Sequence, residues 1–577
     1  MKKLMLLTGI LAFLLLSCEE HDWEWVVTRE AKLGQDGEET ETCSLHPGET
    51  RGKRTIHYWG NWEPVTITDE ICNGEIKKCV NCGIDGEKRN IIPHNWSAWV
   101  TTTPATEEAD GSRYHSCQNT SCLRQVTEII PQLTRQFWAQ NFRSGGGFYS
   151  LDAKLLATGT YCKVYADTAS NATKETAAEV QNEFDTKIYT NMLNTFGYVG
   201  SITVNGTTIA NNIMGYADWL GDGDGKLCIL LLDIRDNYSA SNSAYTGGYF
   251  WNGDLYTISP NSNKRDMIFI DTYPGLQMDK QNTFATLAHE MQHMISYVTG
   301  LLYRDEDLDE WIDEGLSSAA EWVYFNDHTK NGRVNDYKNN RSGLINKGNN
   351  FFVWGNRTNE NANALLDDYS TVYLFFQWLR LQASSTGVYK YIIQSEDYDY
   401  KAVTSSFSLI MGNNNYSDWS YLLETWLAAN RINAASGLYG YKNEAALSTI
   451  KAPDAPAGST SIQLYPGEGV YSKTTSQPDT TPSSNIQYAY LSTTVSGSYV
   501  EDSILLTFNK NTNIGGAREQ GTTTGLASVS AVPEGRAVQP NELIRIDARD
   551  MLRQNGNWRN AAYPRPIRAN RINTNEN

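Results

Sequence analysis

Two histidines and a glutamate in the middle of the chain have the spacing of a metal-binding helix. His289, Glu290 and His293 form an H-E-x-x-H segment inside a run, 281–298, whose apolar residues recur every three or four positions. This periodicity predicts an amphipathic helix, on which residues i and i+4 share one face. Both imidazoles can therefore bind one Zn²⁺ ion, and Glu290 can take a proton from the attacking water.

The alternative interpretation is a solvated helix face that carries two surface histidines. The chain has eight histidines, and the one other histidine after residue 131 is His328. Because histidine is this scarce in the second part of the chain, the pattern favours a metal site over a chance pairing.

A catalytic zinc ion commonly takes three protein ligands and keeps one open position. The metzincin extension of the motif requires Gly at 296 and His at 299, where this sequence has Ser296 and Thr299. A second predicted helix, 311–323, instead offers Glu314 and Glu321 on one face, two turns apart. We expect Glu314 to bind the metal and Glu321 to orient a ligand histidine. Surface ion pairing is the alternative for both carboxylates.

The two helices together resemble those of the gluzincins, the zinc peptidases that include thermolysin and the aminopeptidase N family. The resemblance rests on H-E-x-x-H followed by W-x-x-E-G-x-x-x-x-A-E at 311–321. With segments 222–226, 248–254 and 287–295 it extends to the hyicolysin-like metallopeptidases and covers roughly residues 135–450. It implies a neutral zinc peptidase whose zincin-like domain has a small β-sheet, an active-site helix and a helical subdomain.

The resemblance also bears on two details of the expected site. Aminopeptidase N relatives carry a G-x-M-E-N segment for the free amino terminus, and this sequence lacks it, which favours an endopeptidase. Segment 369–379 resembles the one that supplies a catalytic tyrosine in aminopeptidase-like gluzincins. Tyr369 is therefore the candidate donor to the oxyanion, Tyr373 the second choice and His328 a weaker one. A packing role is the alternative, because the chain has 33 tyrosines.

Three aspartates near residue 220 raise the question of calcium. Asp218, Asp222 and Asp224 precede an apolar run at 227–233 that predicts a buried strand, as does 267–271. An EF-hand loop does not fit, because Lys226 and Leu231 stand where ligands are needed. A turn into the strand is favoured, and Ca²⁺ is left as an unsupported alternative.

The first 131 residues contain a tandem repeat with a period of 37 residues. Trp25, Trp62 and Trp99 recur at this interval, which is typical of a repeat array. Seven of the nine cysteines and five of the eight histidines lie in this part of the chain. The repeats resemble Trp/Cys repeats of bacterial surface proteins, and this resemblance implies a stalk or an adhesion role.

The cysteines of the repeats have two interpretations. Cys79, Cys82 and His94, for example, could hold zinc. Disulfides that staple units too small to form a core are the alternative in an exported protein. Because the number of candidate ligands differs between repeats, we favour disulfides or other structural staples. Cys162 and Cys228, outside the repeats, could form a disulfide or remain two buried thiols.

The N-terminus predicts export. Lys2 and Lys3 precede an apolar run, 4–16, that closes with Leu-Leu-Ser-Cys18. This end resembles a bacterial lipobox, which implies cleavage before Cys18 and attachment of lipid to it; a plain signal peptide is the alternative. Several acyl chains on one residue anchor a protein firmly. The sequence therefore predicts a lipid anchor in the bacterial cell envelope, on an extracytoplasmic face.

Length and charge complete the prediction. A chain of 577 residues suggests several domains, and a net charge of −18 argues against nucleic-acid binding. We expect a multidomain α+β protein with a signal peptide (1–17), three repeats (18–131), a zincin-like domain (132–450) and a small β-rich domain with a polar tail (451–577). The leading functional hypothesis is a lipid-anchored zinc metalloendopeptidase acting on protein or peptide substrates. The alternative is a surface adhesin that retains the zincin scaffold for binding.

Overall fold

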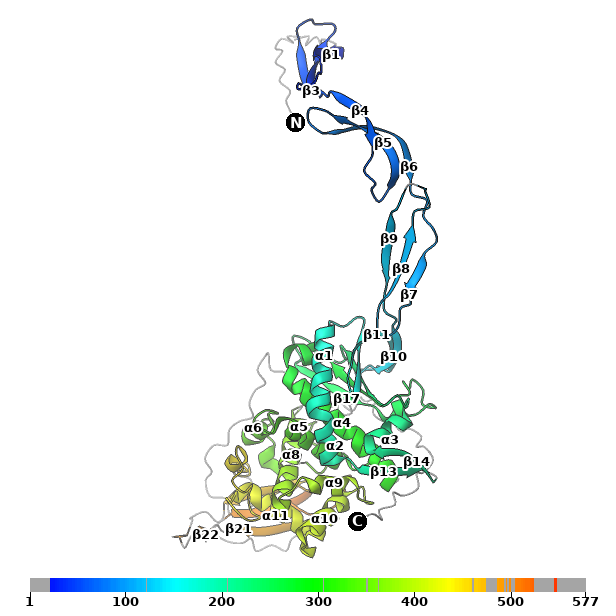
Figure 1. Ribbon diagram of the computed structural model, residues 1–577. Helices are drawn as coiled ribbons and strands as arrows, with labels where there is room; N and C mark the ends of the chain where they lie inside the picture. The colour runs from blue at the N-terminus through cyan, green and yellow to red at the C-terminus, as the bar shows by residue number, and fades with distance from the viewer. Residues whose placement is uncertain are drawn as a thin grey trace, which may run out of the picture. The chain divides into compact units, whose positions relative to one another are not determined.

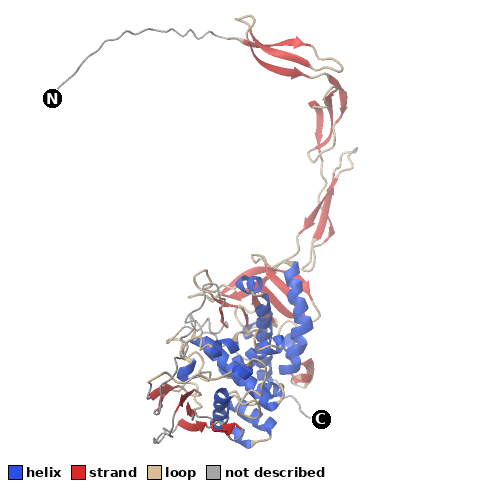
Figure 2. Cartoon of the chain, turned by 90° about the vertical axis from the view of Figure 1, so that its left-hand side faces the viewer, coloured by secondary structure: helices blue, strands red, loops and turns tan. Residues whose placement is uncertain are grey.

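The chain has a mixed α+β architecture with two compact units, Met1–Leu133 and Thr134–Asn577, so the predicted fold class is confirmed at this level. The computed structural model describes residues 21–546 except 121, 205, 305, 349–350, 362, 459–460, 474–484, 492–493, 496–497, 500–503 and 523–543. Cys18 and the predicted signal peptide lie outside the described residues. Figure 2 shows that the described helices all fall in the second unit.

The described residues of the first unit form three antiparallel sheets of three strands each. Their faces are largely exposed, and each of Trp25, Trp62 and Trp99 lies under an arginine guanidinium at 4.1–4.6 Å. Such thin sheets bury little apolar surface. The strands are β1 (Trp23–Arg29), β2 (Gly37–Cys43), β3 (Thr50–Ile56), β4 (Trp59–Pro64), β5 (Ile71–Cys79), β6 (Asp85–Pro93), β7 (Val100–Thr103), β8 (Gly111–Ser116) and β9 (Gln125–Ile130).

The second unit is built on a six-stranded sheet with the order β10-β11-β12-β15-β18-β17. The central strand β15 pairs in parallel with β12 and β18, and the outer pairings are antiparallel. Every residue of β15 is buried, which explains its uninterrupted apolar sequence. The strands are β10 (Arg135–Gln140), β11 (Phe148–Thr158), β12 (Cys162–Asp167), β15 (Leu227–Leu232), β17 (Gly248–Phe250) and β18 (Met267–Asp271).

Alternate residues of β15 enter two different cores. Ile229 and Leu231 pack with the helices, whereas Leu230 and Leu232 pack with Phe137 on the opposite face. Cys162 and Cys228 are two buried thiols that belong to different cores. The elements on the helical side are α1 (Lys174–Glu183), α2 (Tyr189–Phe196), the hairpin β13 (Val199–Val204) and β14 (Thr207–Asn212), and α3 (Ile213–Leu220).

Three long helices form the centre of the second unit (Figure 1). They are α4 (Lys280–Tyr303), α5 (Glu310–Phe325) and α8 (Ala364–Ala383). The helices predicted at 281–298 and 311–323 are therefore present. Glu310 and Asp313 in the first turn of α5 favour its start, because acidic side chains stabilise a helix N-terminus. Almost every residue of α4 from Thr283 to Gly300 is buried, so α4 is an internal helix.

We expect Gly315→Ala to destabilise the contact between α5 and α8. A Cβ atom at Gly315 would lie 2.3 Å from Phe376 and 2.9 Å from Val372. Overpacking of this kind typically costs about 1–3 kcal/mol, which thermal unfolding measures as a lower melting temperature. At Gly300 in α4 the nearest atom is Arg304 Nη2 at 3.4 Å, so Gly300→Ala should be neutral or stabilising. Equal melting temperatures for the two variants would contradict the described packing.

The remaining helices and the last strands pack around α8 and α11, and β21 lies beside α11 (Figure 1). Arg357 and Glu468 form a buried two-point ion pair, 2.7 Å at each contact, that ties the last strands to the helical part. The boundary at residue 450 stays a prediction. The helices are α6 (Arg333–Lys338), α7 (Ile345–Gly348), α9 (Gly387–Ile393), α10 (Tyr400–Met411) and α11 (Trp419–Ile432).

None of the described helices combines the length and apolar character that a membrane span needs. Short strands complete the described chain. The runs predicted as strands at 487–493 and 503–508 correspond to β21 and β24. The strands are β16 (Ala244–Thr246), β19 (Ser461–Leu464), β20 (Gly469–Lys473), β21 (Ile486–Leu491), β22 (Thr494–Val495), β23 (Ser498–Tyr499), β24 (Ile504–Asn509), β25 (Glu519–Thr522) and β26 (Ile544–Ile546).

Candidate metal centre

Helices α4 and α5 bring three potential metal ligands together. Donor atoms of His289, His293 and Glu314 all lie within 4.8 Å of one another, and all three side chains are buried. Glu314 Oε2 is 3.4 Å from His289 Nε2 and 3.8 Å from His293 Nε2. The two histidines come from successive turns of α4, and Glu314 comes from the second turn of α5.

These residues fit a zinc ion in both distance and chemistry. With zinc bonds of about 2.0–2.2 Å to nitrogen and oxygen, tetrahedral geometry separates two ligand atoms by about 3.4 Å. The other nitrogen of each ring is already used: His289 Nδ1 is 3.1 Å from Glu321 Oε1, and His293 Nδ1 is 3.0 Å from Asp313 Oδ2. Such hydrogen bonds fix the tautomer of a metal-binding histidine. Both Nε2 atoms are thus left to face Glu314.

The side chains that contact Nδ1 of the two histidines have further partners of their own. Arg333 Nη2 donates to Glu321 Oε1 at 3.1 Å, and the Arg333 guanidinium lies 4.5 Å from the ring centre of Tyr369. Ser317 Oγ lies 3.0 Å from His293 Nδ1 and also bonds Gln292. Burial opposes a charge on His289, but the hydrogen bonds that His289 donates to the carboxylates of Glu314 and Glu321 outweigh it and raise the pKa of His289 to about 10.

Glu290 lies beside this group with its carboxylate oriented by the backbone. Phe250 N donates to Glu290 Oε2 at 3.0 Å, and Phe250 ends β17, the outermost strand of the six-stranded sheet. Glu290 is buried and follows His289 directly on α4. His289, His293 and Glu314 are called the metal group below. A carboxylate at the position of Glu290 can act as a general base towards a water molecule at the metal group.

The structure places the three candidate oxyanion donors differently. Tyr369 on α8 is buried and packs edge-on against Trp354. Tyr373, one turn further along α8, has its hydroxyl 2.6 Å from His328 Nδ1, and His328 Nε2 in turn bonds Glu444. Burial raises the pKa of Tyr373 well above its ordinary value. Tyr373 and His328 are thus joined in one buried network, whereas Tyr369 contacts Arg333, a partner of Glu321.

The three aspartates considered for calcium lie close together but carry cationic partners. Asp222 is 2.7 Å from Arg265 Nη1, and Asp224 is 2.8 Å from Lys163 Nζ. Asp218 Oδ1 accepts a hydrogen bond from Gly225 N, as expected for a turn into β15.

Sequence reasoning missed several side chains around the metal group. Asp313, Ser317 and Arg333 were not singled out, although Asp313 directly precedes Glu314 in the sequence. The signal that could have identified Asp313 and Ser317 is their spacing from Glu321. The three residues follow one another at intervals of four, and residues four apart share a helix face. The contact between Phe250 and Glu290 has no sequence signal, since the donor is a backbone N–H.

Two comparisons with known proteins bear on this site. The sequence profile of a family described as "Protein of unknown function (DUF1570)" matches residues 283–346, a segment that includes His289, His293, Glu314 and Glu321. The neutral metalloprotease ShpI of Staphylococcus hyicus is 29% identical over 390 residues, which cover 65% of this chain and 77% of ShpI. This distant similarity supports a metallopeptidase that acts on a peptide or protein with a metal cofactor.

Proposed function

We propose that the chain is an exported, lipid-anchored zinc metalloendopeptidase of the gluzincin group, with a zincin-like domain centred on α4 and α5. The observation that carries this proposal is the convergence of His289 Nε2, His293 Nε2 and Glu314 Oε2, with Glu290 next to them on α4. The similarity to ShpI supports the reaction class.

The residues of the site have separate roles in this proposal. A bound zinc ion supplies the Lewis acid that acidifies water and polarises a peptide carbonyl. Glu290 accepts the proton of the attacking water and delivers it to the leaving amine. Glu321 and Asp313 hold the two imidazoles through their Nδ1 atoms, so that Nε2 of each ring stays available to the metal.

Tyr369 is our candidate for the group that stabilises the oxyanion. Its contact with Arg333, which also bonds Glu321, supports a position near the metal group. A tyrosine hydroxyl aimed at the developing negative charge would lower the barrier without itself changing charge. We assign endopeptidase rather than aminopeptidase activity because the chain lacks the G-x-M-E-N segment.

Removal of the metal is expected to abolish peptide hydrolysis, and Zn²⁺ should restore it. The purified protein is treated with a chelator, assayed on a library of quenched peptides, and assayed again after addition of Zn²⁺ until the rate no longer rises. Peptides blocked at both ends should be cleaved as well as unblocked ones, because an endopeptidase needs no free terminus.

Two outcomes would contradict a metallopeptidase, and a third would contradict an endopeptidase. Chelator-insensitive hydrolysis by pure protein would exclude a metal-dependent reaction. Tight binding of one zinc ion at this site without any hydrolysis would favour the adhesin, in which the scaffold serves for binding alone. Cleavage restricted to peptides with a free amino terminus would retain the metallopeptidase but replace endopeptidase by aminopeptidase.

Lipid attachment at Cys18 is expected to hold the protein in the bacterial envelope, because Lys2 and Lys3 precede an apolar run that ends at this cysteine. Cells grown with a labelled fatty acid should incorporate the label into the wild-type protein and not into Cys18→Ala. Label in both proteins, or in neither, would contradict the anchor and leave the peptidase proposal unaffected.

A further inference from the structure

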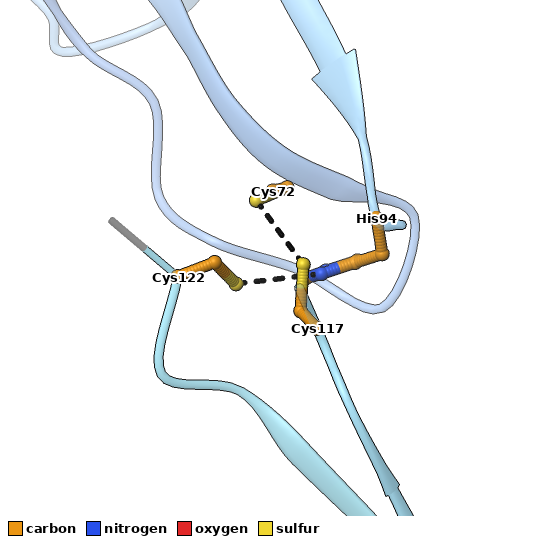
Figure 3. Close-up of side chains that lie close together, drawn as sticks. All are labelled: Cys72, His94, Cys117 and Cys122. Atoms are coloured by element: carbon orange, nitrogen blue, oxygen red, sulfur yellow. Dashed lines mark hydrogen bonds between the residues drawn. The ribbon is translucent and has the colours of Figure 1, made fainter. Parts of the chain in front are cut away.

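Four side chains of the first unit converge on a common centre that no strand pairing explains. Donor atoms of Cys72, His94, Cys117 and Cys122 lie within 4.8 Å of one another, and Figure 3 shows the four side chains turned towards each other. Cys72 Sγ is 3.6 Å from Cys117 Sγ, and Cys122 Sγ is 3.4 Å from His94 Nδ1.

These distances match a tetrahedral metal site and not a disulfide. A disulfide joins its sulfurs at about 2.05 Å. Around a zinc ion, with bonds of about 2.3 Å to sulfur and 2.05 Å to nitrogen, two sulfurs lie about 3.8 Å apart and a sulfur and a nitrogen about 3.6 Å apart. The eight cysteines that the structure describes are all free of disulfides. The prediction that the cysteines of the repeats form disulfides is therefore wrong for the described residues.

The histidine of the cluster is held in the tautomer that a metal requires. His94 Nε2 lies 2.9 Å from the carbonyl oxygen of Thr68. A carbonyl accepts only, so Nε2 carries the proton and Nδ1 presents its lone pair to the three sulfurs. A hydrogen bond from the distant ring nitrogen to a backbone carbonyl is the usual partner of a metal-binding histidine.

A second cluster repeats this arrangement one repeat earlier. Asp36, His57, Cys79 and Cys82 also have donor atoms within 4.8 Å of one another. His57 Nδ1 lies 3.4 Å from Cys82 Sγ and 3.7 Å from Asp36 Oδ2, and Cys79 Sγ lies 3.6 Å from Asp36 Oδ1. Asn81 Nδ2 donates to Asp36 Oδ1 at 2.9 Å. Each cluster thus offers three anionic ligands and one imidazole, with Asp36 in the place of Cys72.

Both clusters lie at a junction between consecutive repeats. Cys72 belongs to β5 of the second sheet, whereas Cys117 and Cys122 lie in the loop that connects β8 to β9 of the third. Asp36 precedes β2 of the first sheet, whereas Cys79 ends β5 of the second. The number of candidate ligands differs between repeats because each cluster takes its ligands from two consecutive repeats. The zinc set suggested from the sequence, Cys79 with Cys82 and His94, is likewise wrong, because His94 lies in the other cluster.

The thin sheets of the first unit have little hydrophobic core, and a cluster of candidate ligands lies where such a core would be. Within the described part of the first unit, the one cluster of buried apolar side chains is formed by Cys72, Cys117 and Cys122 with Trp96 packed against it. Domains this small commonly depend on a metal or disulfides for stability, and the free energy of metal binding then contributes to folding.

We propose that the first unit binds two structural Zn²⁺ ions, one at each of these junctions, and that each ion joins two consecutive repeats. Cys72, Cys117 and Cys122 with His94 bind one ion; Cys79, Cys82 and Asp36 with His57 bind the other. Each thiol loses its proton to solvent on binding. A third cluster, His21 with Cys43 and His46, offers only three donors among the described residues.

The proposal predicts how zinc content changes in variants of the full chain purified in reductant with zinc present. Cys117→Ser and Cys82→Ser should each lose one equivalent of zinc relative to wild type, and the double variant should lose two. His115→Ala is the matched control, because His115 stacks between Trp96 and Trp99 in the third repeat but lies outside the cluster. This control should keep all of the zinc. His293→Ala separately removes the proposed catalytic ion, so the two proposals fail independently.

Cobalt substitution provides a measurement that does not depend on how well the serine variants fold. The wild-type protein loaded with Co²⁺ should show thiolate-to-cobalt charge-transfer absorption in the near ultraviolet. Asp36→Cys should keep its metal and increase that absorption, because the second site would then have the same ligands as the first. Unchanged zinc content in Cys117→Ser and Cys82→Ser, absence of thiolate–cobalt absorption in wild type, or recovery of these cysteines as disulfides without zinc would each overturn the proposal.

Discussion

Glu290→Gln is expected to lower kcat for peptide hydrolysis by about 10²–10⁴-fold, the usual contribution of a general base. The amide oxygen of glutamine can still accept the hydrogen bond from Phe250 N, which Glu290 Oε2 accepts at 3.0 Å. The amide cannot take a proton from water. Zinc content and melting temperature should therefore stay at their wild-type values while turnover is lost.

Initial rates on one quenched peptide, together with metal analysis of the same samples, measure this effect. Glu175→Gln on α1 is the matched control, because Glu175 is an exposed carboxylate on a helix of the same unit; it should leave kcat unchanged. A loss of activity in Glu290→Gln that is accompanied by loss of zinc would show that Glu290 supports the metal site and does not act as the base.

Glu314→Gln and Glu321→Gln should separate a metal ligand from the partner of a ligand. Glu314 Oε2 faces both Nε2 atoms, whereas Glu321 Oε1 reaches the remote nitrogen of His289. Loss of an outer partner typically weakens metal binding by about 10–100-fold. We expect Glu321→Gln to fall in this range and Glu314→Gln to weaken zinc binding further, since it removes an anionic ligand.

Competition with a zinc-binding dye measures both affinities. Glu424→Gln is a suitable control because Glu424, on α11, is a half-buried carboxylate outside the group, with its pKa raised by burial. It should keep wild-type affinity. An equal effect of Glu314→Gln and Glu321→Gln would place both carboxylates in the same role and require a different third ligand.

The elements that carry the candidate site could be predicted because their sequences are periodic. Apolar residues at three- and four-residue spacing located α4 and α5, and a short apolar run located β15. The extent of burial could not be predicted in the same way. The periodicity of α4 predicts an amphipathic helix, with a solvated histidine face as the alternative, but α5 and the sheet pack on α4, and only the packing of distant segments decides this.

The contacts around the metal group were less accessible to sequence reasoning than its ligands. Helical spacing alone brings His289 and His293 to one face, and the position of Glu321 on the second helix predicted that it orients one of the ligand histidines. The pairing of His293 with Asp313 depends on how α5 crosses α4. The position of Arg333 between Glu321 and Tyr369 depends on α6, a short helix with no strong sequence signal.

The shared donors at the junctions limit how the length of the repeat array can change. The second repeat supplies Cys79 and Cys82 to one cluster and Cys72 to the next. Deletion of part of it would leave thiols without a complete donor set. Deletion of the whole repeat would instead bring Asp36 to His94, Cys117 and Cys122, the same donor set as Asp36, His57, Cys79 and Cys82. Tandem duplication and loss of entire repeats could therefore lengthen or shorten this part of the chain in steps of 37 residues, with every junction still complete.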